Sequence, residues 1–174
     1  MNRVSKVLLN TVLLPAIWLT ANVSAQISEA VAERNGTVIA TLHAEGAQIY
    51  ECKLDPGKSP SEVHALTWQF REPVAALFAD GKSIGRHYAG PNWDHVDGSG
   101  VKAKVTASTP GTTPNDIAWL NLDVVDRRGN GILSDATTVQ RVNTKGGVVK
   151  GSCESAGSYR SVPYSADYVF QRKT

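Results

Sequence analysis

The sequence predicts an all-β protein, a single antiparallel β-sandwich or barrel domain closed by one disulfide. Three observations lead to this fold class. Apolar and polar residues alternate with a period of two in several short segments, and Gly, Pro, Asn and Asp turn signals separate these segments. No segment keeps a helical period, so nothing indicates a helical layer. Two cysteines, Cys52 and Cys153, are available for a single bridge.

The first 25 residues have the order of a secretory signal. Arg3 and Lys6 form a short positive region, an apolar run follows over 7–19, and Val23-Ser24-Ala25 supplies the small residues that signal peptidase reads. The apolar run is too short for a membrane anchor. We therefore expect a signal peptide at 1–25, a polar lead-in at 26–35, and one all-β domain at 36–174. The predicted location is secreted or periplasmic, with no membrane anchor after the signal is removed.

The net charge and the two cysteines limit the possible partners and predict how the cysteines pair. The formal net charge is +2, and loss of Arg3 and Lys6 with the signal brings it to about zero. No basic field remains for nucleic acid, which we exclude as a partner. In an oxidising compartment a lone cysteine pair most simply forms one structural disulfide, so we predict a Cys52–Cys153 bridge.

The strands can be placed along the chain. An initial hairpin is expected, with strands on either side of a turn at Ala44-Glu45-Gly46, and Pro73 is expected at an edge or a bend. The last strand carries an aromatic stripe of Tyr164, Ala166, Tyr168 and Phe170 on one face. The remaining strands are expected at 66–70, 74–79, 82–88, 93–97, 101–108, 118–124 and 137–144.

The stretch from Asp80 to Ser108 holds the densest group of functional residue types. If 89–92 is a four-residue hairpin loop, Tyr88 faces Trp93, His87 faces Asp94 and Arg86 faces His95. In this register His87 and Asp94 share one face. The residues expected on the other face are Arg86, Tyr88, Trp93, His95 and Asp97.

This stretch supplies the candidate site residues. His87 with Asp94 is the candidate catalytic pair, a general base and its orienting carboxylate. The candidate binding residues are Arg86, Tyr88, Trp93, His95 and Asp97, an aromatic platform for a saccharide or another small flat molecule. Each has a structural alternative: a hydrogen-bonded histidine, a cross-strand aromatic pair, or turn chemistry at 97–100.

No metal site or cofactor is predicted. The two histidines fall on opposite faces in this register, which argues against a shared metal. The sequence contains no GxSxG, HExxH, P-loop or GxGxxG motif after a strand. Whether the protein is an enzyme is therefore left open.

The order of motifs resembles an uncharacterised exported family, catalogued as domain of unknown function 3455. The segment from Gly85 to Trp93, GRHYAGPNW, matches the family's G-x-H-x-A-G-P-x-W core, and Asp94 stands where the family often has Glu. The resemblance implies an extracytoplasmic protein with paired Cys52 and Cys153, and it implies no established activity. The other matching segments are IYECK (49–53), LTWQF (66–70), IAWLNLDV (117–124), VQRVNTKGG (139–147) and VPYSADYVF (162–170).

Three functions remain as hypotheses. The first is a ligand-binding or interaction module that uses the 85–97 hairpin. The second is a metal-assisted or acid–base hydrolase that uses His87 and Asp94. The third is a structural component of an envelope or matrix.

Overall fold

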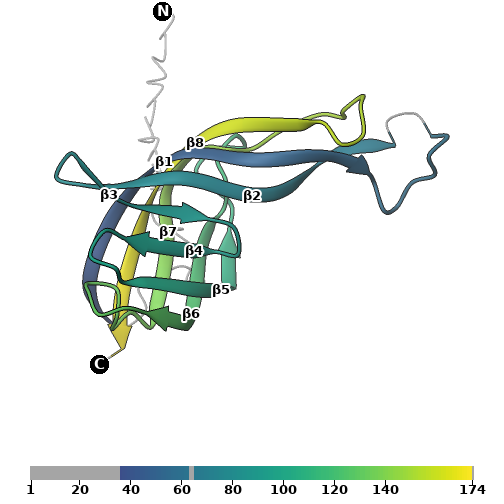
Figure 1. Cartoon of the computed structure of the whole chain (residues 1–174). Helices are drawn as coiled ribbons and strands as arrows, with labels where there is room; N and C mark the ends of the chain where they lie inside the picture. Colours follow the sequence, from purple (N-terminus) through teal and green to yellow (C-terminus); the bar gives the residue numbers. More distant parts are fainter. Residues whose placement is uncertain (1–35, 63–64, 174) are drawn as a thin grey trace, which may run out of the picture.

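The fold is a closed antiparallel barrel. The structure is a computed structural model that describes residues 36–62 and 65–173. Within these residues eight strands form one sheet in chain order, and pairing of the first strand with the last closes it (Figure 1). The strands are β1 (Gly36–Leu54), β2 (Leu66–Ala79), β3 (Lys82–Tyr88), β4 (Asn92–His95), β5 (Gly100–Thr109), β6 (Trp119–Arg128), β7 (Thr138–Gly146) and β8 (Tyr159–Lys173).

The all-β prediction is confirmed, and the architecture is the barrel rather than the sandwich. The predicted signal peptide and polar lead-in lie outside the described residues. Among the described residues, no helix is long and apolar enough to cross a membrane.

The predicted hairpin at the start of the domain is wrong. β1 runs without a turn through Ala44-Glu45-Gly46 and pairs with β2 on one side and β8 on the other. Gly46 serves a close approach of two backbones, because a Cβ there would collide with the Val74 carbonyl and with Ala75. A glycine that signals a turn in the sequence is here a packing requirement.

Three strands are longer than the barrel needs. β1, β2 and β8 continue past the other strands and form an arm to one side (Figure 1). The segments predicted at 66–70 and 74–79 are one strand, β2, which pairs with β3 only from Ala75 onward. Pro73 therefore lies where β2 has a free edge, which agrees with its missing N–H and with the predicted edge position.

The disulfide fastens the arm, and its prediction is confirmed. Cys52, near the end of β1, is bonded to Cys153 in the loop before β8, with Cα atoms 5.9 Å apart. Backbone hydrogen bonds surround it, from Gly157 N–H to the Cys52 carbonyl (2.9 Å) and from Cys153 N–H to the Leu66 carbonyl (3.2 Å). The bridge thus joins the first strand to the connection that leads into the last.

The barrel interior combines small and large side chains. Small residues on β1, β2 and β8 leave room for three large rings, Trp93, Tyr168 and Phe170, which are almost fully buried. The predicted stripe on β8 forms one wall of this core. The small residues are Ala40, Ala44, Ala75 and Ala166.

One end of the barrel is closed by the β6–β7 loop (129–137). Leu133 and Ala136 of this loop are fully buried in the core cluster. The loop is held to the β4–β5 turn, because Leu133 N–H donates to Ser99 Oγ (3.2 Å) and Ile132 N–H donates to Asp97 Oδ2 (2.8 Å). The β3–β4, β5–β6 and β7–β8 loops lie at the opposite end, which stays open to a cavity.

Candidate functional site

The β3–β4 hairpin has a register one residue away from the predicted one. Its pairs are Tyr88 with Asn92, His87 with Trp93, and Arg86 with Asp94. The loop is three residues, 89–91, and the Asn92 side-chain amide closes it with a hydrogen bond to the Ala89 carbonyl (2.5 Å). The shift reverses the predicted partners, since it brings His87 to Trp93 and separates it from Asp94.

His87 lies inside the barrel. Its ring stacks on Trp93 with centroids 4.5 Å apart and planes 14° apart, and the Tyr168 ring lies 4.8 Å away. Nδ1 is 2.9 Å from the Asn92 carbonyl, which only accepts, so Nδ1 carries the proton. Burial, the largest effect, and the Arg141 charge lower the pKa of His87, the hydrogen bond to the Asn92 carbonyl raises it, and the net result is a pKa of about 4. The imidazole is therefore neutral at pH 7.

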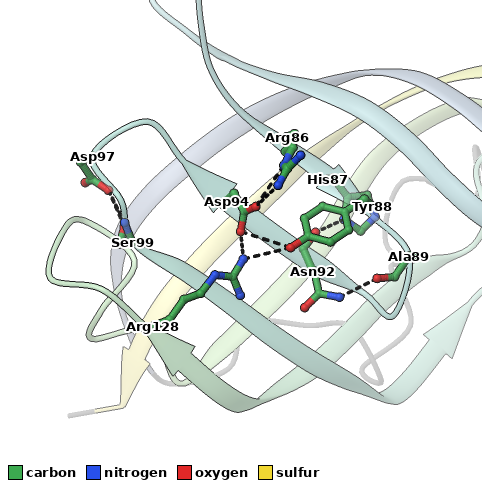
Figure 2. Close-up of polar contacts among 9 residues, drawn as sticks. All are labelled: Arg86, His87, Tyr88, Ala89, Asn92, Asp94, Asp97, Ser99 and Arg128. Carbon is green, nitrogen blue, oxygen red and sulfur yellow. Dashed lines mark hydrogen bonds and ion pairs between the residues drawn. The ribbon is translucent and has the colours of Figure 1, made fainter.

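Asp94 lies outside the barrel in a complete ion network (Figure 2). The Arg86 guanidinium donates to Asp94 Oδ2 through Nε (3.0 Å) and Nη2 (2.9 Å). Arg128 forms an ion pair with the other carboxylate oxygen and also donates to Tyr88 Oη (3.0 Å). The Arg86 guanidinium also lies over the Tyr88 ring, with Cζ 4.8 Å from the ring centroid. This arrangement holds the hairpin to β6 and leaves Asp94 no contact with His87.

His95 and Asp97 form the β4–β5 turn. His95 Nδ1 is 3.0 Å from Asp97 Oδ1, which also accepts from Ser99 N–H (2.9 Å) and Ser99 Oγ (2.6 Å). Desolvation raises the pKa of Asp97, but hydrogen bonds from Ser99, Ile132 and His95 outweigh it and hold that pKa well below its usual range. Asp97 and Ser99 join this turn to the loop that closes the barrel.

The open end of the barrel contains a cavity of about 370 Å³, here called the lumen pocket. Its walls are mainly apolar and aromatic, and they come from β1, β2, β5, β6, β7 and β8 as well as the hairpin. The apolar lining residues are Phe70, Pro73, Pro91, Trp93, Val105, Ile117, Ala118, Leu120, Leu122 and Val148. The other lining residues are Gln48, Tyr50, Arg71, His87, Gly90, Arg141 and Tyr168.

Two buried polar atoms of this lining lack partners. Gln48 is 3% exposed and Trp93 is 1% exposed. Across the part of the chain that the structure describes, neither Gln48 Nε2 nor Trp93 Nε1 has a hydrogen-bond partner. An unpaired buried N–H carries a desolvation cost of about 1–3 kcal/mol, so both atoms are suited to a ligand acceptor.

Arg141 is one of the two arginines that line the lumen pocket. It lies on β7 directly opposite Tyr168 of β8 and Leu120 of β6. Its Nε donates to the Ala118 carbonyl (3.0 Å), which fixes the side chain against the wall. Within residues 36–62 and 65–173, no carboxylate forms an ion pair with it.

The predicted candidates thus separate into three places. His87 and Trp93 line the lumen pocket, Arg86, Tyr88 and Asp94 form the outer network, and His95 and Asp97 form the closed end. Sequence reasoning missed Gln48 and Arg141. A usable signal existed for Arg141, because it follows Val139 by two positions and so shares the inward face of its strand.

The described residues contain no group of three or more His, Cys, Asp or Glu side chains placed to hold a metal ion.

The fold and the site define a class: a disulfide-bonded, closed eight-stranded antiparallel barrel with an apolar pocket at its open end. The family model described as "Protein of unknown function (DUF3455)" matches residues 32–172, so the chain belongs to that family. Searches of the curated proteins and of the solved structures returned no match.

The burial of neutral His87 predicts a pH-dependent stability. The pKa of about 4 lies below the ordinary value of 6.5. Between these values the unfolded chain binds more protons, so stability is full above pH 6.5 and falls as the pH drops toward 4. We expect the free energy of unfolding to fall by about 2 kcal/mol from pH 7 to pH 5 through this group. Urea titrations across this range measure it.

The control is His87→Phe, which keeps a ring between Trp93 and Tyr168 and cannot titrate. The fall with pH should be smaller in this variant by about the same 2 kcal/mol. Parallel stability–pH curves for the two proteins would contradict the prediction.

Proposed function

We propose that the protein is a binding protein that takes up a small organic molecule in the lumen pocket. The observation that carries the proposal is the cavity of about 370 Å³, whose walls are mainly apolar but include the unpartnered N–H groups of Gln48 and Trp93. Ligand pockets of about 300–1,000 Å³ with few polar groups are typical of small-molecule sites. Eight-stranded barrels are wide enough to hold one small ligand.

The geometry around the hairpin favours binding over acid–base chemistry. His87 is stacked between rings and donates through Nδ1 to a backbone carbonyl, and Asp94 is engaged by Arg86 and Arg128 on the opposite face. The acid–base hypothesis needed Asp94 to orient His87, and each of these side chains is engaged by other partners. Arg86 and Tyr88, which the sequence assigned to a ligand platform, have a different task in this proposal, because their contacts hold the hairpin that shapes the pocket wall.

The proposed place of action is outside the cytoplasm, in a periplasm or the extracellular space. Support comes from the Cys52–Cys153 disulfide, since such bridges persist in oxidising compartments. The signal peptide expected at 1–25 would deliver the chain there.

The test uses N-phenyl-1-naphthylamine, a neutral apolar probe whose fluorescence rises in apolar surroundings. We expect saturable binding at one site of the wild type. Val105 lines the pocket and is 43% exposed, so Val105→Trp adds bulk at the mouth with little strain on the core. This variant should weaken probe binding about ten-fold or more.

Val125→Trp is the matched control, because Val125 is an exposed valine on the neighbouring strand β6 that does not line the pocket. Its probe affinity should equal that of the wild type. Absence of saturable binding to folded wild type, or equal affinities for Val105→Trp and Val125→Trp, would overturn the proposed function.

A further inference from the structure

The polar groups left unpaired in the lumen pocket are hydrogen-bond donors. Among the residues that the structure describes, three buried side-chain atoms lack a hydrogen-bond partner. Two of them, Trp93 Nε1 and Gln48 Nε2, belong to residues of the pocket lining, and the third, Trp119 Nε1, does not. An indole N–H can only donate, and so can a guanidinium. The complementary ligand group therefore has several acceptor oxygens and few donors.

The charge of the pocket points to the same group. Arg141 is partly buried in the lining, and neither aspartate nor glutamate is among the described residues that line the cavity. Arg71, the other cation of the lining, is already paired with Glu72 (3.1 Å) and lies over the Tyr159 ring. A guanidinium taken partly out of water without a counter-charge is unfavourable, so an anion in the pocket would be stabilised there.

The Arg141 guanidinium is also held in place in advance. Nε donates to the Ala118 carbonyl at 3.0 Å, and Tyr168 lies opposite on the neighbouring strand. Burial raises the pKa of Tyr168, while the Arg141 charge and a hydrogen bond with Arg141 act to lower it. The Nη groups of a guanidinium fixed in this way match the two oxygens of a carboxylate with little loss of side-chain entropy.

We infer that the ligand is an amphipathic organic acid, whose carboxylate or related oxyanion binds Arg141 while its apolar body lies against the Trp93, Leu120 and Leu122 wall. This inference rests on the proposed function, because it names the ligand class of the same pocket. The apolar body is buried against this wall, and the oxyanion brings acceptor oxygens into a pocket whose unpaired polar atoms are donors.

The experiment compares two displacers of nearly equal shape, 1-naphthaleneacetic acid and 1-naphthaleneacetamide, against the bound fluorescent probe N-phenyl-1-naphthylamine. On the wild type the acid should displace the probe about ten-fold more tightly than the amide, since a charge-assisted pair is worth about 1.5–3 kcal/mol. Arg141→Gln should bring the two affinities to within about two-fold, and Arg141→Lys should retain part of the preference. Both variants should still bind the neutral probe.

Arg127→Gln is the matched control. The Arg127 Nε also donates to a backbone carbonyl, that of Ala136 (2.7 Å), but this arginine belongs to the closed end of the barrel. Its acid preference should equal that of the wild type. If the wild type binds the probe without preferring the acid, or if Arg141→Gln keeps the preference, the inference is overturned and the proposed function stands. If the wild type does not bind the probe, the proposed function itself fails.

Discussion

Replacing both Cys52 and Cys153 with alanine should lower the free energy of unfolding by about 4–5 kcal/mol. The two residues are 101 positions apart, and the chain-entropy model assigns about 4.7 kcal/mol to a loop of this length. Although the bridge lies on the arm, the topology allows it to stabilise the whole barrel. Closure of the barrel requires β1 to pair with β8, and these strands are the first and the last of the described fold. The cross-link keeps their ends together in the unfolded chain.

Urea unfolding of oxidised wild type and of the double variant measures the effect. Wild type unfolded in the presence of a reductant is the control, and it should match the double variant because both lack the bridge. The double substitution avoids the free thiol that a single replacement would leave. A loss below about 1 kcal/mol would mean that the unfolded chain keeps β1 and β8 together without the bond.

The elements that the sequence predicted well have a strong local signal. The stripe of Tyr164, Ala166, Tyr168 and Phe170 alternates strictly, and all four side chains are buried in the barrel. Asp80 and Gly81 lie between the strands predicted at 74–79 and 82–88, and both residues have the positive φ of a tight turn (49° and 73°). Alternation and turn chemistry act over a few residues, so they can be read without the rest of the fold.

The hairpin register depended on a single residue of loop length. Taking 89–92 as the loop paired Tyr88 with Trp93, whereas closure by the Asn92 side chain pairs His87 with Trp93. The side-chain period of a strand is two, so this one-residue difference moved each candidate to a different neighbour. The sequence contains the asparagine, but neither alternation nor composition specifies that its side chain donates to the Ala89 carbonyl three residues earlier.

The lumen pocket was harder to predict from the sequence than the hairpin register. Its walls come from all eight strands and three loops, and Gln48 and Arg141 are 93 positions apart in the chain. Gln48 and Arg141 line one cavity because the sheet closes into a barrel. That closure depends on the long-range pairing of β1 with β8. The inward position of Arg141 could be read from its strand, but the absence of a carboxylate opposite it could be known only from the assembled barrel.

Phe170→Ala should lower the free energy of unfolding by about 3–5 kcal/mol. Phe170 is fully buried, and its ring meets the edge of Trp93 with centroids 5.9 Å apart. The surrounding wall is rigid, because a closed barrel cannot collapse around the space that the ring leaves. The cost therefore includes the cavity as well as the lost burial. Urea unfolding monitored by tryptophan fluorescence measures it.

Two further variants separate packing from other effects of the substitution. Phe170→Leu keeps an apolar side chain that fills part of the space, so its loss should be smaller than that of alanine. Val125→Ala, at an exposed position of β6, should change stability by about 0.5 kcal/mol or less. Phe170 does not line the lumen pocket, so the folded fraction of Phe170→Leu should still bind N-phenyl-1-naphthylamine. Equal losses for alanine and leucine would show that the ring contact with Trp93, rather than the filled volume, stabilises this part of the barrel.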